Sequence, residues 1–287
     1  MRPLPDALQD ELRAALRQAL RGVPPRGDVH DLLGRLGLHG LEIAPAAGGL
    51  GLGLSYGVVV AEELGRVAAC DTYRSGCLAA ETGPAAAAGV AAGARPPATA
   101  PPPAGGALVR ARIRQAAYLV GLAAGAHDLA VRRSGERHQF GRPIAAFQAT
   151  GFALAADLVR IEEVRLLTAY AAWLADRDAA GSPDSAAAQP RAWPPADGEP
   201  DLAAIQALAA AAEAATGVTR RALHLHGTYG LTGDAAIQHY YRLAGTEATR
   251  WGQPAALWRA AGHRRLASAP DTEHTTAVLA AAGKGER

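Results

Sequence analysis

Apolar residues recur at intervals of three and four along most of this chain, which is the spacing of helices that bury one face. Near the start, leucines repeat every four residues from Leu8 to Leu20, with charged residues between them. This pattern predicts a first helix that ends near Gly22, just before a pair of prolines. Two shorter helices are expected at 28–36 and 54–69, separated by a turn rich in proline and glycine.

The second half of the chain predicts longer helices. Helical spacing continues from 145 to 177, a length typical of a helix in a bundle. An alanine-rich helix at 201–225 is followed by a glycine turn at 227–233. The expected helices of this half are 111–136, 145–177, 201–225, 234–250 and 254–265.

Two stretches interrupt the helical pattern. Residues 79–108 consist almost wholly of Ala, Pro and Gly without the alternation that predicts strands, so we expect a linker there. Residues 178–200 hold five prolines among small and acidic residues, which indicates an exposed insert. We therefore predict an all-α protein with an N-terminal helical domain at 1–78, the linker at 79–108, a C-terminal helical bundle at 109–270 and a polar tail at 271–287.

Composition narrows the class of protein. The 287 residues are 49% hydrophobic, enough to bury a substantial core. The 29 basic and 27 acidic side chains nearly cancel and form no dense cluster, which argues against nucleic acid or a membrane as a partner. Cys70 and Cys77 are the only cysteines and no Cys/His group has zinc-like spacing, so neither a disulfide framework nor a metal site is expected. The N-terminus lacks the uncharged core of a secretory signal, and we expect a cytoplasmic protein.

Histidines and tyrosines gather on both sides of the glycine turn, in a chain with only 5% aromatic residues. Because His titrates near neutral pH and Tyr donates or accepts a proton, such a group suits proton transfer without a redox cofactor. Neighbouring residues on a helix face different directions, so only a subset is expected to line one pocket. The group comprises His224, His226, Tyr229, His239, Tyr240 and Tyr241.

Three segments resemble the acyl-CoA dehydrogenases. Residues 136–173, which begin ERHQFGRPIAAFQ, resemble the start of the second helical pair in the C-terminal bundle of that family, and 221–252 resemble its glycine turn and following helix. Glu62 to Arg66 match the family's Glu-Glu-Leu-Gly-Arg sequence. The resemblance implies an N-terminal helical domain and a C-terminal four-helix bundle, with the segment 79–108 in place of the family's middle β barrel. It also implies FAD binding between the subunits of a tetramer.

The resemblance places the family's catalytic base at positions without a carboxylate. These enzymes remove a proton with a glutamate beside the thioester and pass a hydride to the flavin. Ungapped alignment puts Trp251 at the usual glutamate, and the position that a subset of the family uses falls at Ala111. Neither side chain accepts a proton. Glu247, one helical turn before Trp251, is the candidate for a displaced base.

The resemblance also assigns Arg137, Phe140, Gly227 and Gly230 to vestigial FAD positions. A glycine turn lets backbone N–H groups approach a phosphate, although Thr228 stands where the family has a second glycine. Barrel strands hold the flavin ring in the family, and this sequence predicts none. We therefore expect no cofactor, with FAD as the alternative.

Three functions remain open. The first is a flavin-independent acid/base enzyme of secondary metabolism that dehydrates, isomerises or cyclises an acyl thioester or polyketide-like intermediate. Its candidate catalytic residues are His224, His226, Tyr229, Tyr241 and Glu247. The second is a non-catalytic partner subunit of a heteromeric acyl-CoA dehydrogenase, which lends Arg137 to a neighbour's flavin. The third is an active FAD-dependent acyl-CoA dehydrogenase. The expected assembly is a homo-oligomer, or a hetero-oligomer with another acyl-CoA dehydrogenase-like subunit.

Overall fold

The computed structural model describes residues 6–70, 72–97, 101–179 and 199–267. The first half contains α1 (Ala7–Ala19), α2 (His30–Arg35), the 3-10 turn η1 (Pro45–Ala47), α3 (Leu54–Arg66), α4 (Thr72–Ala80) and α5 (Pro84–Ala91). The second half contains α6 (Gly105–Glu136), η2 (Ile144–Ala146), α7 (Gln148–Ala179), α8 (Pro200–His226), η4 (Gly227–Leu231), α9 (Ala236–Glu247) and α10 (Pro254–Ala267). Within the described ranges the only strands are β1 (His138–Gln139) and β2 (Arg142–Pro143), an antiparallel hairpin that pairs His138 with Pro143. The predicted all-α class is confirmed.

The expectation of a helix-free linker over 79–108 is wrong. This stretch contains the end of α4, all of α5 and the start of α6. Pro84 lies in the first turn of α5, where the backbone N–H that proline lacks would have no partner in the helix. Alanine has the highest helix propensity. The Ala/Pro/Gly composition that predicted a linker is therefore also compatible with a helix. Val90 of α5 packs with Ile43 and Ala79 in a small apolar cluster. The connection from α5 to α6 is therefore 92–104, of which 98–100 lie outside the described residues.

Most of the remaining helices are where the periodicity predicts them. The largest shift is at α6, which begins at Gly105, six residues before the expected start at 111. Most of the predicted insert, 180–198, and the end of the chain from 268, which includes the predicted tail, lie outside the described residues. The proposed domain boundaries stay predictions.

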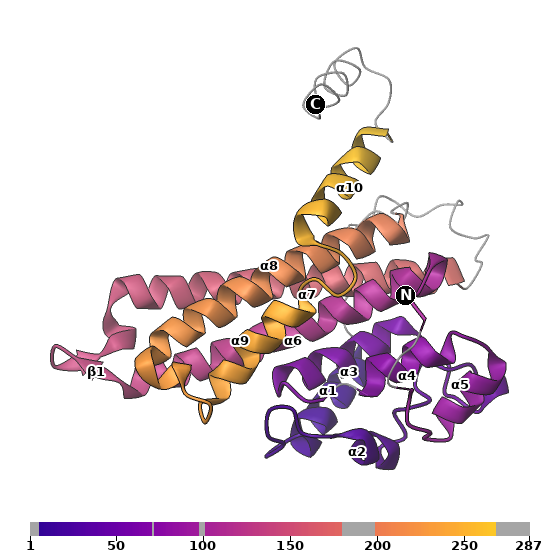
Figure 1. Ribbon diagram of the computed structural model, residues 1–287, viewed down its shortest axis with the longest axis horizontal. Coiled ribbons are helices and arrows are strands. Elements are labelled where there is room, and N and C mark those ends of the chain that lie inside the picture. The colour runs from indigo at the N-terminus through magenta and orange to yellow at the C-terminus, as the bar shows by residue number, and fades with distance from the viewer. Residues whose placement is uncertain (1–5, 71, 98–100, 180–198, 268–287) are drawn as a thin grey trace.

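Three long helices form the body of the molecule. In Figure 1, α6, α7 and α8 run side by side along the longest dimension, and the indigo N-terminal helices pack beside one half of that length. α8 carries a row of fully buried alanines, including Ala204, Ala207 and Ala211, and small side chains let helices approach closely. By length and composition α8 and η4 together are apolar enough to cross a membrane, but 72% of their most apolar window is buried in the fold. Packing in the helical core accounts for this apolar character.

Glycines hold α3 against α6. A Cβ added at Gly121 of α6 would lie 1.9 Å from the carbonyl oxygen of Glu62, and one at Gly65 of α3 would lie 2.1 Å from that of Tyr118. Such distances leave no room for a side chain at the crossing. The two backbones therefore touch, and this contact attaches the N-terminal helices to the bundle.

Glu62 and Glu63 of the family motif, together with Asp176, connect α1, α3 and α7 through polar contacts. Glu63 is almost fully buried on α3 and accepts from Arg13 at 2.9 Å and from Arg17 at 3.0 Å, both on α1. Glu62 accepts from Arg165 of α7 at 2.7 Å. Asp176, near the end of α7, caps α3 by accepting from the backbone N–H of Leu54 at 2.7 Å. These contacts fix α1, α3 and α7 relative to one another.

Candidate functional site

The two positions of the family's base meet at one small hollow. Ala111 of α6 and Trp251, which follows α9, both line it. Its other lining residues are Arg74, Ser75 and Leu78 of α4, Arg114 and Gln115 of α6, and Arg250. The free space is about 10 Å³, about what one water molecule needs. No carboxylate lines this hollow, and three of the eight lining side chains are arginines.

A network of buried ion pairs lies around this hollow. Arg114, with a side chain only 4% exposed, donates to Glu42 at 2.7 Å and to Glu81 at 2.9 Å. Burial alone would lower the pKa of Arg114, but the attraction of the nearby carboxylates outweighs burial and raises the pKa well above its usual value. Arg114 is therefore a fixed cation. Glu42 also accepts from the hydroxyl of Tyr73 at 2.8 Å, which joins α4 to the network.

Glu247, the predicted displaced base, belongs to the same network. Its carboxylate accepts from the amide of Gln115 at 3.0 Å and pairs with Arg74 at 3.3 Å and Arg250 at 3.2 Å. Burial alone would raise the pKa of Glu247, but these three partners outweigh burial and hold the pKa below its usual value. A carboxylate stabilised in its ionised form is a weak general base. The geometry favours Glu247 as the counter-ion of the buried Arg74.

Glu247→Gln is expected to lower the free energy of unfolding by about 1.5–3 kcal/mol at neutral pH, because the buried Arg74 loses a carboxylate partner. Since the folded pKa of Glu247 lies below the unfolded value of about 4.3, its contribution is complete above that value and is lost as pH falls through the folded pKa. Urea unfolding followed by circular dichroism should show wild type and variant converging below about pH 4. Asp31→Asn, at a side chain 79% exposed, is the control and should change little. A difference that stays constant down to acidic pH would contradict this role.

The structure does not bring the predicted His/Tyr site together. His226 is buried, its Nδ1–H donates to the carbonyl of Ala222 at 2.7 Å, and burial lowers its pKa. His224 near the end of α8, Tyr229 in η4 and Tyr241 on α9 are all exposed. None of these four residues contributes to the lining of the two pockets found among the described residues.

Tyr240 of that group and Glu247, the candidate base, lie in different places again. The hydroxyl of Tyr240 donates to the carbonyl of Arg66 at 2.7 Å, and burial raises the pKa of Tyr240 to about 12. Tyr240 thus joins α9 to the end of α3 and is not available for proton transfer. Glu247 lies at the opposite end of α9 from the glycine turn, about 16 Å along the helix axis. A single site cannot contain both His226 and Glu247.

Two of the four vestigial FAD positions, Arg137 and Gly227, do meet. A Cβ added at Gly227 would lie 2.7 Å from Nη1 of Arg137, so the guanidinium rests directly against the glycine turn. Gly227 has φ +63°, a backbone conformation that favours glycine. Phe140 is 93% exposed at the tip of the hairpin, while Gly230 is buried. Among the described residues, no acidic side chain pairs with Arg137.

These residues fit one half of a flavin dinucleotide. An unpaired guanidinium beside a glycine turn suits a phosphate group. No described residue forms a barrel strand that would hold the isoalloxazine ring, because the hairpin is the only sheet in the described ranges. The fit is therefore to the phosphate end alone.

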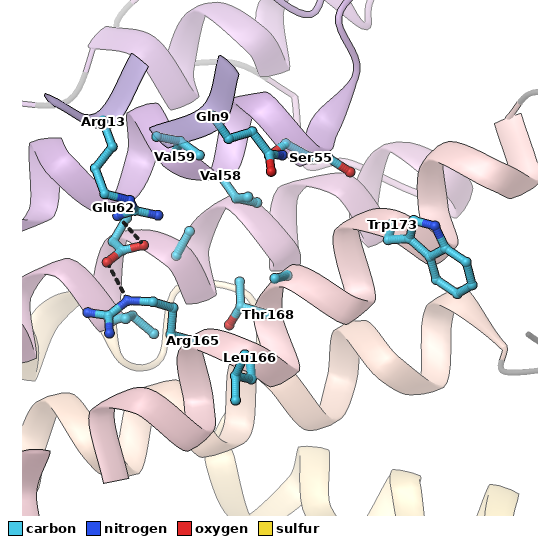
Figure 2. A pocket seen from close by; sticks show the side chains of 13 residues that line it. Gln9, Arg13, Ser55, Val58, Val59, Glu62, Arg165, Leu166, Thr168 and Trp173 are labelled. Atoms are coloured by element: carbon cyan, nitrogen blue, oxygen red, sulfur yellow. Dashed lines mark hydrogen bonds and ion pairs between the residues drawn. The ribbon is translucent and has the colours of Figure 1, made fainter. Parts of the chain in front are cut away.

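A second, larger cavity, which the sequence analysis did not predict, lies between α1, α3, α6 and α7. Its free volume is about 70 Å³. Figure 2 shows Glu62 and Arg165 at one end and Trp173 at the other, with Val58 and Val59 between them. The charged side chains at the first end pair with one another, as Glu62 accepts from both Arg13 and Arg165. The rest of the cavity lining, which a ligand would contact, is mainly apolar.

The chain belongs to the acyl-CoA dehydrogenase family. Residues 104–253 match the family's C-terminal domain, and residues 6–91 match its N-terminal domain. The two matches leave 92–103 between them, where the resemblance places the middle β domain. The resemblance seen in the sequence is thus confirmed for both helical parts.

The curated relatives are much longer than this chain. The chain is 36% identical over 131 residues to 3-sulfinopropanoyl-CoA desulfinase of Paraburkholderia xenovorans, a match that covers 46% of this chain and 29% of that protein. It is 34% identical over 128 residues to a probable acyl-CoA dehydrogenase of Mycobacterium tuberculosis, covering 44% and 28%. The matched segment thus spans less than a third of these relatives.

Solved structures show the same architecture. The ChsE4-ChsE5 complex from Mycobacterium tuberculosis has a TM-score of 0.77 at 18% identity, covering 94% of this chain and 100% of that chain. Butyryl-CoA dehydrogenase from Megasphaera elsdenii has a TM-score of 0.71 at 16% identity, covering 93% and 100%. At these identities the likeness establishes the fold alone.

Proposed function

We propose that this protein is a non-catalytic partner subunit of a heteromeric acyl-CoA dehydrogenase. One observation carries the proposal: both family base positions, Ala111 and Trp251, border a hollow of about 10 Å³ surrounded by buried ion pairs. A thioester has no space beside a base there. The chain nevertheless keeps the helical bundle of the family, which is what a subunit needs for assembly.

The Arg137 face is the part that a neighbouring subunit would use. Arg137 has no acidic partner in the described residues and lies against Gly227, so it is available to a phosphate. Phe140 of the hairpin, and Tyr229 and Leu231 of η4, are 93%, 53% and 64% exposed. An exposed apolar surface of this kind favours contact with another protein. We therefore propose that this face holds the phosphate end of a flavin whose ring and catalytic base lie in the other subunit.

The alternative functions have less support. The flavin-independent acid/base enzyme depended on the His/Tyr group, whose members His226 and Tyr229 face the interior and the solvent respectively. The active dehydrogenase depended on Glu247, which three partners hold in its ionised form. The ChsE4-ChsE5 structure is described as a complex, which fits a family that assembles unlike chains.

Co-expression with a full-length acyl-CoA dehydrogenase homologue encoded nearby tests the proposal. The two chains are expected to purify as one complex that shows flavin absorption and dehydrogenase activity, while this chain alone is colourless. Failure of the chains to form a complex would exclude the partner function. Flavin bound by this chain alone would favour the active dehydrogenase instead.

Arg137→Met is expected to weaken flavin retention by that complex about tenfold, the loss of roughly one charge-assisted phosphate contact. Released flavin is measured by fluorescence after dilution. Arg142→Met is the matched control, because Arg142 lies on the same hairpin but stacks over the ring of Phe147 at 4.1 Å. Equal retention by the two variants would show that Arg137 does not touch the flavin.

A further inference from the structure

The cavity between α1, α3, α6 and α7 is apolar over most of its length. Val58 and Val59 of α3, Val120 of α6 and Trp173 of α7 are buried and line it. Its free volume of about 70 Å³ is about five times what one water molecule needs. Leu166 also lines the cavity and is 55% exposed, so the cavity opens to solvent beside it. Apolar pockets with a few polar groups are typical of sites for small molecules.

The uncharged polar side chains of the lining already have partners within the fold. The hydroxyl of Ser55 donates to Asp176, and the hydroxyl of Thr168 donates to a backbone carbonyl of its own helix at 2.8 Å. The amide nitrogen of Gln9 donates to the carbonyl of Ser55 at 2.7 Å, and its amide oxygen accepts from a backbone N–H at 3.0 Å. These groups connect the helices to one another, so orienting a ligand falls to the charged end of the cavity.

The end of the cavity opposite Trp173 carries two guanidinium groups with nitrogens left over. Arg13 makes both of its ion pairs through Nη1, with Glu62 at 3.0 Å and with Glu63 at 2.9 Å. Arg165 uses Nε and Nη1, and no described residue accepts a hydrogen bond from Nη2 of either arginine. Figure 2 shows the two arginines on either side of Glu62.

The charge that lines this end is positive. Arg13 and Arg165 both line the cavity, and among the described residues Glu62 is the one carboxylate that does. Glu63 and Glu162, which also pair with these arginines, lie outside the lining. Burial alone would lower the pKa of each guanidinium, but the attraction of the carboxylates outweighs burial and raises it, so both stay cations. An anionic group that accepts hydrogen bonds suits their remaining nitrogens.

The cavity therefore requires a ligand with an apolar body and an anionic head. We propose that it binds a short unbranched carboxylic acid of about four to six carbons, with the carboxylate at Arg13 and Arg165 and the last carbon at Trp173. No residue lines both this cavity and the hollow at Ala111 and Trp251, so the acid has a site of its own. This site is also independent of the proposed partner subunit.

Isothermal titration calorimetry of the full chain alone with butyrate, pentanoate and hexanoate tests the site. Hexanoate is expected to bind with a dissociation constant below about 1 mM. Affinity should rise about fourfold with each added methylene. Hexanol and hexylamine, which lack the carboxylate, should bind at least about tenfold more weakly. No saturable binding of hexanoate, or hexanol bound as tightly as hexanoate, would overturn the proposal and leave the partner-subunit function untouched.

Ala169→Leu tests where the acid binds. Ala169 of α7 is a half-buried lining residue, and a larger side chain there takes up space in the cavity. The affinity for hexanoate should fall at least about tenfold. Ala153→Leu is the matched control and should leave the affinity unchanged, because Ala153 is also half-buried on α7 but does not line the cavity. Equal affinities in the two variants would overturn the location.

Bromine placement tests the orientation in the wild-type chain, so the result does not depend on the folding of a variant. Hexanoate brominated at its terminal carbon should quench the tryptophan fluorescence more strongly than hexanoate brominated next to the carboxylate, because only the first brings bromine to Trp173. Trp173→Phe should remove the difference. Equal quenching by the two bromo acids in the wild-type chain would overturn the proposed orientation.

Discussion

Arg114→Met is expected to lower the free energy of unfolding by about 3–5 kcal/mol, the range for breaking a buried ion pair by removing one partner. The reason is the position of Glu42, whose side chain is 7% exposed and which receives two guanidinium nitrogens of Arg114. Methionine fills much of the space of the arginine side chain but carries no charge. The lost free energy of unfolding therefore reflects the Glu42 carboxylate without its cation more than an empty cavity. Urea unfolding followed by circular dichroism measures it.

Two companion variants make this result interpretable. Arg160→Met removes an ion pair with Glu213 in which the side chains are 46% and 44% exposed, and it should cost less than about 1 kcal/mol. Adding Glu42→Gln to Arg114→Met should recover part of the loss, because the buried charge is then removed as well. A single variant within about 1 kcal/mol of wild type would show that the network is not structurally important.

The network also bears on the proposed partner-subunit function. Arg114 and Gln115 come from α6, Arg74 from α4 and Glu247 from the end of α9, so the network joins the N-terminal helices to the bundle. Gln115 donates to both the backbone and the side chain of Glu247. At the place where the resemblance predicts a thioester beside a catalytic base, this chain has a network of polar contacts that connects α4, α6 and α9. This arrangement supports the proposal that the chain acts as a non-catalytic partner subunit.

Sequence patterns predicted the helices well because each depends on local spacing. The buried residues Leu154, Ile161 and Val164 on α7 follow helical periodicity directly, and the bounds of the three long helices were predicted to within six residues. α5 was missed for a different reason. Its residues 84–91 are nearly all alanine and glycine after a proline, so no polar face reveals the period, and packing of Val90 against Ile43 decides its structure.

The site was harder to predict because its contacts join distant parts of the chain. Arg114 and Glu42 are 72 residues apart, and nothing local marks either as buried. The His/Tyr group illustrates the opposite case, in which residues close in sequence lie apart in the fold. His224 is exposed and His226 is buried, so the two do not share one face of α8. The resemblance assigned Arg137 and Gly227 to the same cofactor, and the structure places the two residues in contact.

Gly121→Ala is expected to destabilise the protein by about 3 kcal/mol or more, the upper end for overpacking a closed contact. The added methyl group would lie 1.9 Å from the carbonyl oxygen of Glu62 and 2.8 Å from the backbone nitrogen of Arg66, and backbone atoms cannot rotate away. α3 must then separate from α6. Urea denaturation and thermal melting both measure the loss.

Gly217→Ala separates this steric effect from the general preference of helices for alanine. Gly217 lies inside α8, and a Cβ there would meet nothing within 4 Å. That substitution should stabilise the protein by about 0.5–1 kcal/mol, since alanine loses less backbone entropy than glycine in a helix. If Gly121→Ala were as well tolerated as Gly217→Ala, the close backbone contact between α3 and α6 would not be what attaches the N-terminal helices to the bundle.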